Sequence, residues 1–310
     1  MNLYLSEISL KNFCTNIFFL LRKNLKETII EQRQADTYNQ IMLASMASAE
    51  YAKKYKSEIE RLQARGRFTF YPSQDIPEYD ESAIQGGFDS AKGLAFVDHN
   101  GKKLYFPASY TVKQAKRAYY EMAVCDSILG TDAKGTPHQY QGKDYCLKEG
   151  DVLVDVGCAE ALFALDNIEK ASKVILIERN SSWLKALRAT FQPYMHKVRL
   201  VNKLVSRNDS KSTITLQTLL AGESRPIFIK MDIEGYEVET IRSAQEFLTQ
   251  KSDITLACCT YHTNNDAQQL ETLFQAMGYS HEYSDGYMLF TRYDQPLFPY
   301  FRHGLIRAKK

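Results

Sequence analysis

Four carboxylates of this chain stand at the ends of short apolar runs. Asp155 follows the letters VLV, Glu178 follows VILI, and Asp232 and Glu234 lie just beyond IFIKM. A continuous apolar run of this length is typical of a strand that is covered on both faces. A carboxylate at the tip of such a strand is well placed to bind a ligand or to accept a proton.

A turn residue follows the first of these acids. Gly157 comes two positions after Asp155 and allows a sharp turn from the strand into a helix, whose first backbone N–H groups can hold polar ligand atoms. Glu178 ends the next apolar run, and an acid at that place can accept hydrogen bonds from both hydroxyls of a ribose. The pattern predicts a nucleoside site without specifying the nucleoside.

Charged and apolar residues alternate in the stretch IFIKMDIEG at 227–235. Alternation places Lys230, Asp232 and Glu234 on one side of a strand. Burying unpaired charges is costly, so these side chains must meet a cleft, each other or water. His262 ends another apolar run and is expected at the same cleft edge, because open α/β sheets bind ligands at the carboxyl ends of their strands.

The elements that must position these residues alternate along the second half of the chain. Helices separate most of the expected strands, which implies crossover connections and a parallel sheet. The expected strands are 152–156, 173–178, 198–205, 227–233 and 254–260. A helix is predicted over 266–277, with Gly278 as its C-terminal cap. Residues 279–293 predict a closing antiparallel hairpin that turns at Asp285-Gly286.

The first half of the chain has a different pattern. An Ala-rich helical stretch runs from Gln40 to Ala64 and stops at Gly66. Asn100-Gly101 lies between two apolar runs and predicts a hairpin over 94–106, followed by a helix capped by Thr111. We therefore expect a helical and hairpin region at 1–149 and an α/β, doubly wound domain at 150–310. The first region is expected to select the molecule that binds at the cleft of the second.

Composition limits the possible partners and location. The 310 residues carry a formal net charge of +2, which gives no long-range attraction to nucleic acid or anionic membrane, so no nucleic-acid partner is expected. The six cysteines form no CxxC pair, which argues against a structural zinc or a disulfide scaffold and favours a cytoplasmic location. The apolar segment 16–21 is too short for a transmembrane helix. It is expected to pack on a partner surface, and a peripheral membrane contact or a homodimer contact are the alternatives.

Residues from about 150 to 293 resemble the FkbM family of S-adenosylmethionine-dependent, class I methyltransferases. The matching stretches are DVGCAEALFAL, ILIERN, VRLVNKLVS, FIKMDIEGYEVETIRSA and TYHTNNDAQQLETLFQAMGY. The resemblance implies a Rossmann-like, mostly parallel sheet that ends in an antiparallel hairpin. It also implies methyl transfer to a hydroxyl group of a small molecule or a saccharide.

The resemblance assigns S-adenosylmethionine as the cofactor and gives individual residues roles. Asp155 and Gly157 are expected beside its methionine part, Glu178 at its ribose and Asn202 near its adenine. The family commonly has Asn-x-Gly where this chain has Ala159-Glu160-Ala161. Glu160 is expected to supply a replacement contact at the amino end of the cofactor, and weaker binding is equally allowed.

Methyl transfer to a hydroxyl benefits from a positioned base. Asp232 or His262 is the expected base, with Glu234 shaping the acceptor side. A divalent cation held by Asp232 and Glu234 is an alternative, since it would lower the pKa of the hydroxyl. Two carboxylates on one strand do not complete an oxygen cage, so no metal is expected. Two other interpretations remain open: a catalytically silent domain that binds a partner, and a nicotinamide-dependent oxidoreductase, which should have more glycines after Asp155.

Overall fold

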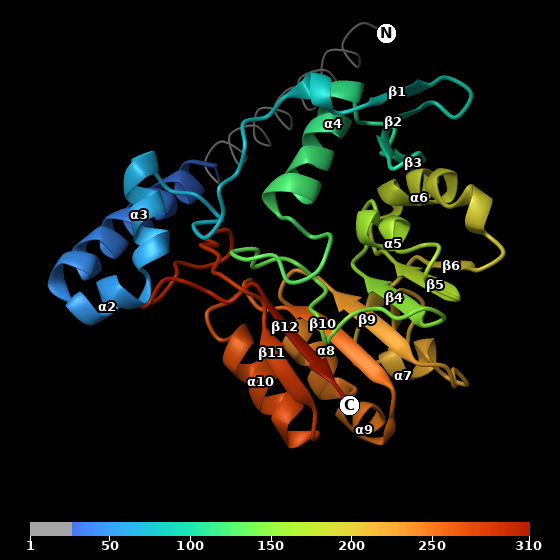
Figure 1. The fold of residues 1–310 in the computed structure, drawn as a ribbon. Coiled ribbons are helices and arrows are strands. Elements are labelled where there is room, and N and C mark those ends of the chain that lie inside the picture. Colours follow the sequence, from blue (N-terminus) through green and yellow to red (C-terminus); the bar gives the residue numbers. More distant parts are fainter. Residues whose placement is uncertain (1–26) are drawn as a thin grey trace, which may run out of the picture. The chain divides into compact units, whose positions relative to one another are not determined.

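The computed structural model describes residues 27–310, which form two compact units. One unit contains the chain up to Phe70 together with Phe290–Tyr300, and the other contains Tyr71–Leu289 together with Phe301–Lys310. The apolar segment 16–21 and Cys14 lie outside the described residues. Figure 1 shows the course of the chain.

The first unit is built from helices and one returning segment. Residues 27–47 are helical, and α2 (Ala49–Lys54) and α3 (Lys56–Arg65) follow. Gly66 ends α3 in a left-handed conformation, as predicted from the sequence. The segment 290–300 packs on these helices, because Tyr51 stacks on Phe298 and donates a 3.0 Å hydrogen bond to the carbonyl oxygen of Pro299.

A seven-stranded sheet forms the centre of the second unit. Its order is β11-β12-β10-β9-β4-β5-β6, and among the described strands of this sheet only β12 runs opposite to the other six. The strands are β4 (Val152–Val156), β5 (Lys173–Ile177), β6 (Val198–Val201), β9 (Ile227–Met231), β10 (Ile254–Cys259), β11 (Ser280–Tyr283) and β12 (Leu305–Lys309). The expected α/β, mostly parallel and doubly wound sheet is thus confirmed.

The predicted closing hairpin was wrong in its second strand. β11 pairs with β12, so the partner strand comes from the last residues of the chain and not from 287–293. Asp285-Gly286 does not close a hairpin, because Asp285 accepts a hydrogen bond from the backbone N–H of Gly135. The backbone N–H of Tyr287 donates to the hydroxyl of Ser73. These contacts hold the segment away from β11.

The expected strand 198–205 was also wrong, because it is divided into two parts. Its end, β7 (Leu204–Val205), pairs with β8 (Thr213–Ile214) in a separate two-stranded sheet. Asn202 lies at the break, where its side-chain amide donates to the carbonyl oxygens of Glu178 and Arg179. The chain therefore leaves the main sheet after β6.

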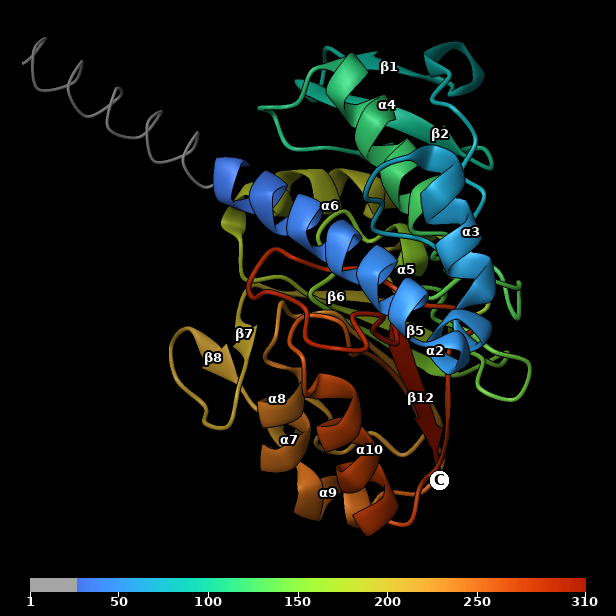
Figure 2. The same cartoon turned by 90° about the vertical axis from the view of Figure 1, so that its left-hand side faces the viewer.

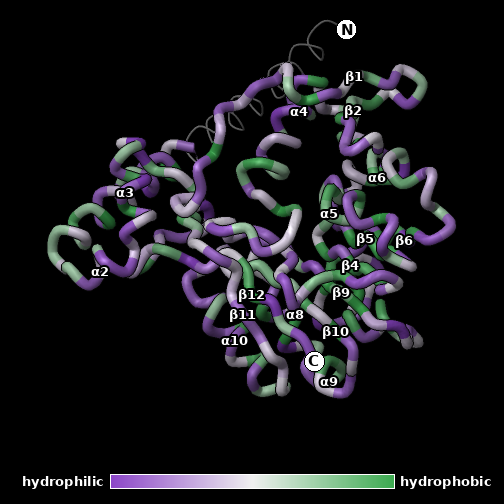
Figure 3. Tube along the Cα trace, viewed as in Figure 1, coloured by the Kyte–Doolittle hydropathy of each residue, from purple (hydrophilic) through white to green (hydrophobic). Residues whose placement is uncertain are grey.

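Helices cover both faces of the main sheet. On one face, four helices pack against the odd-numbered residues of β9 and form a hydrophobic core with them. These helices are α7 (Leu216–Leu219), α8 (Glu237–Ser243), α9 (Gln245–Gln250) and α10 (Asp266–Ala276). Figure 2 shows these helices grouped together, and Figure 3 shows the hydrophobic character of the central strands. On the opposite face α5 (Leu162–Asp166) places Phe163 against Phe228. The side chains of Asp155, Lys230 and Cys259 are buried on this second face.

The predicted hairpin and helix before the sheet domain are confirmed. β2 (Leu94–His99) and β3 (Lys102–Tyr105) turn at Asn100 and Gly101, which both have positive φ, and β1 (Gly86–Asp89) pairs with β2. Thr111 caps α4 (Val112–Tyr120) in a capping box with Gln114, and Glu121–Cys125 continues as a π-helix. On the other side of the hairpin lies α6 (Leu184–Thr190).

Short 3₁₀ turns complete the described structure at Glu81–Ala83, Ser181–Trp183 and Gln192–Tyr194. None of the helices in residues 27–310 combines the length and the apolar character needed to span a bilayer.

Candidate functional site

The carboxyl ends of β4, β5, β9 and β10 meet at one edge of the sheet, where most of the predicted site residues lie. A cavity of about 390 Å³ opens at this edge. Five of the predicted residues line it: Gly157, Ala159, Glu178, Asp232 and Glu234. The edge contains the switch point of the sheet order, because the chain leaves β4 toward β5 and later returns on the other side of β4 as β9.

The turn after β4 requires a glycine at position 157. Its φ is +72°, and a Cβ atom there would lie 1.9 Å from the carbonyl oxygen of Asp232. The turn therefore brings the backbones of β4 and β9 into close contact beside the cavity. Ala159 and Ala161 also have positive φ, at 45° and 61°, a conformation that costs alanine free energy.

Glu178 connects the two loops that border the cavity. One carboxylate oxygen accepts a 3.0 Å hydrogen bond from the backbone N–H of Ala159, and the other accepts a 2.6 Å bond from that of Asn180. Each oxygen keeps lone-pair capacity for a ligand. Asn202 fixes the backbone after Glu178, and the described lining of the cavity does not include it. Its contact with a cofactor remains a prediction.

A smaller cavity of about 120 Å³ adjoins the first and shares Gly157, Ala159 and Asp232 with it. Asp155 and Glu160, both predicted from the sequence, line this smaller cavity together with Lys230. Burial raises the pKa of Glu160 to about 7. The predicted cofactor residues, apart from Asn202, thus line two adjoining cavities.

Lys230 neutralises the buried Asp155. The two residues are register partners on β4 and β9, and their charged atoms are 3.0 Å apart. Lys230 also donates a 2.8 Å hydrogen bond to the carbonyl oxygen of Gly157. Burial lowers the pKa of Lys230, but Asp155 and Asp232 raise it by more, so the lysine stays charged. The charge of Lys230 is thus paired with a carboxylate of the neighbouring strand and not with one of its own strand.

Asp232 lies between two imidazoles. His262 Nε2 is 3.4 Å from Oδ1, and His138 Nε2 is 3.6 Å from Oδ2. Tyr140 donates a 3.2 Å hydrogen bond to Oδ2. Burial raises the pKa of Asp232, yet His138, His262 and Lys230 together lower it well below its ordinary value. Asp232 is therefore an ionised carboxylate at the meeting point of both cavities.

His262 is held by a second carboxylate. Its Nδ1 atom lies 3.3 Å from Glu237, which is fully buried. Burial lowers the pKa of His262, but Glu237 and Asp232 raise it by more. The same Glu237 accepts hydrogen bonds from the backbone N–H groups of Ile233 and Gly235 and so fixes the turn after β9. Glu234 lies in this turn with a φ of 60°, exposed at the rim of the larger cavity.

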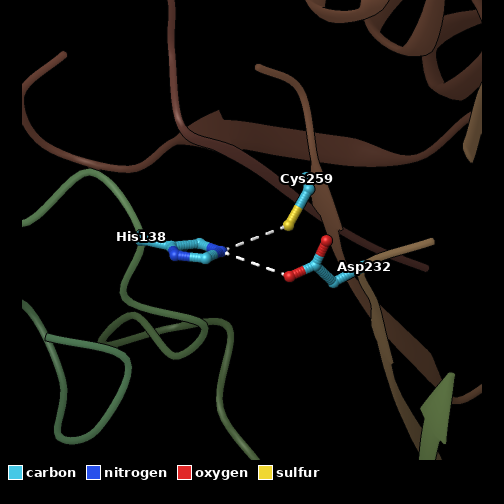
Figure 4. A group of neighbouring side chains, drawn as sticks. All are labelled: His138, Asp232 and Cys259. Carbon is cyan, nitrogen blue, oxygen red and sulfur yellow. Dashed lines mark hydrogen bonds and ion pairs between the residues drawn. The ribbon is translucent and has the colours of Figure 1, made fainter. Parts of the chain in front are cut away.

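The sequence did not predict that His138, Tyr140 and Cys259 meet beside Asp232. His138 and Tyr140 come from the loop 130–144, and nothing in its local pattern predicts where it packs. His138 Nε2 lies 3.4 Å from the sulfur of Cys259, the last residue of β10 (Figure 4). One signal was present for Cys259, because strand alternation puts it on the face opposite Cys258.

Comparison with known proteins identifies part of the chain. Residues 173–281 match the family described as methyltransferase FkbM domain. Among curated protein sequences, none matches significantly. Solved structures with similar folds include a methyltransferase FkbM from Methylobacillus flagellatus, with 19% identity over 53% of this chain and 44% of that chain and a TM-score of 0.41. This chain thus covers less than half of the Methylobacillus protein.

Two further similar structures are methyltransferases with different named substrates. A precorrin-6y C5,15-methyltransferase from Geobacter metallireducens has 18% identity over 54% of this chain and 83% of that chain, with a TM-score of 0.36. An rRNA methylase from Streptococcus thermophilus has 13% identity over 53% of this chain and 89% of that chain, with a TM-score of 0.35.

Proposed function

We propose that this chain, which has a class I methyltransferase fold and carries an FkbM methyltransferase domain at 173–281, is an S-adenosylmethionine-dependent O-methyltransferase. The observation that supports this function best is the pair of adjoining cavities, with Glu178 in one, Glu160 and Lys230 in the other, and Asp232 shared by both. The expected acceptor is a hydroxyl group of a saccharide or another small molecule.

The residues at the sheet edge fit this cofactor. Glu178 has the lone pairs to accept the ribose hydroxyls, and the absence of a Cβ at Gly157 allows close backbone approach. Glu160 would hold the ammonium group and Lys230 the carboxylate of the methionine part, because each offers the opposite charge. When bound, S-adenosylmethionine supplies a methyl group that its sulfonium makes electrophilic.

The chain's own residues would orient the acceptor and receive its proton. A hydroxyl is a weak nucleophile at neutral pH, so an ionised carboxylate that accepts its hydrogen bond directs the oxygen toward the electrophile. Asp232 is suited to this role because His138, His262 and Lys230 keep it charged. His262 orients Asp232, and Glu237 orients His262. Glu234 borders the larger cavity and is proposed to shape the entrance.

A methyl-transfer assay tests this function directly. The full chain is incubated with S-adenosylmethionine carrying a labelled methyl group and a panel of saccharides and other hydroxyl compounds. Label in the acceptor is expected with the native chain. The Asp232→Asn variant should lose turnover and keep cofactor binding, whereas unchanged turnover in this variant would remove Asp232 from the mechanism. An RNA sample in the same panel tests the expectation that nucleic acid is not the acceptor.

A further inference from the structure

Three different side chains converge beside the sheet, next to the smaller cavity. His138 comes from the loop before the sheet, Cys259 ends β10, and Asp232 follows β9 (Figure 4). Their donor atoms all lie within 4.8 Å of one another. His138 is 4% exposed and Cys259 is fully buried, so bulk water does not separate these atoms.

His138 Nε2 has more polar neighbours than one ring nitrogen can bond. His138 Nε2 faces three polar atoms: the Cys259 sulfur at 3.4 Å, the Tyr140 hydroxyl at 3.3 Å and Asp232 Oδ2 at 3.6 Å. One ring nitrogen carries at most one hydrogen, so it cannot donate to all three. The separation of 3.6 Å from the carboxylate is also longer than the roughly 2.7–3.2 Å of an N–H···O hydrogen bond.

The same distances match the edges of a metal coordination shell. Zinc binds nitrogen at about 2.0–2.1 Å, oxygen at about 2.0–2.2 Å and sulfur at about 2.3 Å in a tetrahedron, so neighbouring ligand atoms lie about 3.3–3.6 Å apart. His138 Nε2 is 3.4 Å from Cys259 Sγ and 3.6 Å from Asp232 Oδ2. A nitrogen, a sulfur and a carboxylate oxygen are all zinc ligands.

We propose that His138, Cys259 and Asp232 form a binding site for one divalent transition metal ion, with zinc as the expected metal. Three protein ligands leave a fourth position for water or for the hydroxyl of Tyr140, an arrangement typical of catalytic rather than structural zinc. His138, Tyr140 and Asp232 all line the smaller cavity, so the fourth position faces the space proposed for the methionine part of the cofactor. The inference depends on the donor atoms alone and not on the proposed methyl transfer.

The other ring nitrogen of His138 faces a carboxylate. A metal-binding histidine usually turns its second ring nitrogen toward such a group, which fixes the ring. His138 Nδ1 lies 3.8 Å from Asp126 Oδ2, longer than a hydrogen bond, so a small approach of the two groups is needed for Asp126 to fix the ring. Asp126 in turn accepts a hydrogen bond from Tyr71. Asp126 would therefore be the outer partner of the histidine ligand.

A second group, formed by Asp232, Glu237 and His262, is less suited to a metal. Both carboxylate oxygens of Glu237 already accept backbone hydrogen bonds, at 2.7 Å from Ile233 and 2.9 Å from Gly235. The described lining of the two cavities includes neither Glu237 nor His262, so a metal held there would lack space for a further ligand. The sequence analysis expected no metal because it paired Asp232 only with Glu234, whereas the structure pairs Asp232 with a histidine and a cysteine.

Cobalt binding tests the site without reference to methyl transfer. The full chain is treated with a chelator, desalted and titrated with Co²⁺ while its absorption spectrum is recorded. We expect one equivalent to bind, with the intense visible bands of a tetrahedral ion and a thiolate-to-cobalt charge-transfer band. Added Zn²⁺ should remove both signals. Binding should release protons to solvent, because the thiol of Cys259 must be deprotonated.

Matched variants assign the signal to these residues. Cys259→Ser should abolish the charge-transfer band, and Cys258→Ser should retain it, since Cys258 is equally buried on the opposite face of the same strand. His138→Gln should weaken cobalt binding strongly, and Asp126→Asn by about 10- to 100-fold. Far-ultraviolet circular dichroism confirms that each variant is folded. No thiolate band in the native chain, or a band that survives Cys259→Ser, would overturn the proposal.

Discussion

Asp155 on β4 and Lys230 on β9 form a buried ion pair, 3.0 Å apart, between directly adjacent positions of two parallel strands. Their side chains are 1% and 6% exposed. A buried charge whose partner is removed remains uncompensated, which typically costs about 3–5 kcal/mol. Asp155→Asn should therefore lower the free energy of unfolding by about this amount, measured by urea denaturation of the full chain.

An exposed ion pair provides the control for this prediction. Arg117 and Glu121 are 2.9 Å apart on the surface, with about half of each side chain exposed. Pairs of this kind contribute about 0.2–1 kcal/mol. Glu121→Gln should therefore have a small effect, and an equally small effect of Asp155→Asn would show that the buried pair does not stabilise the sheet.

Gly157 and Gly222 offer a matched test of the close contact between β4 and β9. Their φ values are 72° and 75°, but a Cβ at Gly222 would meet no atom within 4 Å, whereas one at Gly157 would lie 1.9 Å from the Asp232 carbonyl oxygen. Gly222→Ala should cost about 1–2 kcal/mol of stability from backbone strain. Gly157→Ala adds overpacking and should cost more than about 3 kcal/mol.

Thermal or urea unfolding of both glycine variants measures this difference. A Gly157→Ala protein that binds S-adenosylmethionine normally and is as stable as Gly222→Ala would contradict the close backbone contact. It would also remove the reason for a glycine at this turn.

Cofactor binding should depend on pH through Glu160. Burial raises the pKa of this carboxyl from 4.5 to about 7, so it is largely protonated at pH 6 and ionised at pH 8. A cationic ammonium favours the ionised form, so binding releases a proton below pH 7 and the affinity should increase from pH 6 to pH 8. Calorimetric titration at several pH values measures this slope, and Glu160→Gln should remove it.

The same shift has the opposite effect on the stability of the cofactor-free protein. Because the pKa in the folded state lies above that in the unfolded state, the folded chain binds more protons between about pH 4.5 and 7. The contribution of Glu160 to the free energy of unfolding should therefore decrease as the pH rises through this window. A contribution that increases would show that the carboxyl is not buried as described.

The main strands were predictable because each is a short apolar run followed by a polar residue. Local pattern is sufficient where a strand is covered on both faces, as in β4, β5, β9 and β10. The pairing partner of β11 was not predictable, because β12 lies more than 20 residues further along the chain. Only the contacts of the intervening segment with Ser73 and Gly135 exclude the nearer hairpin.

The site was predictable where its residues end strands. Asp155, Glu178, Asp232 and His262 meet at one edge because parallel strands share a carboxyl edge. His138 lies on a loop, and its position opposite His262 depends on tertiary packing that no local pattern encodes. The predictions of a cytoplasmic location, a homodimer and an acceptor-selecting region at 1–149 remain predictions.

Glu178 should contact the ribose if S-adenosylmethionine binds in the two adjoining cavities. Glu178→Gln replaces a charged acceptor of ribose hydroxyls and should weaken binding by about 10- to 100-fold. Glu246→Gln, on an exposed surface of α9, should leave the affinity unchanged.

The deciding measurement is calorimetric titration of the native chain with S-adenosylmethionine and, separately, with NADH. We expect saturable heat with S-adenosylmethionine alone, and we expect this heat to be strongly reduced in Glu178→Gln. Heat with NADH alone would favour an oxidoreductase. No heat with either compound would contradict the proposed binding of S-adenosylmethionine and would favour a catalytically silent domain that keeps the fold to bind a partner.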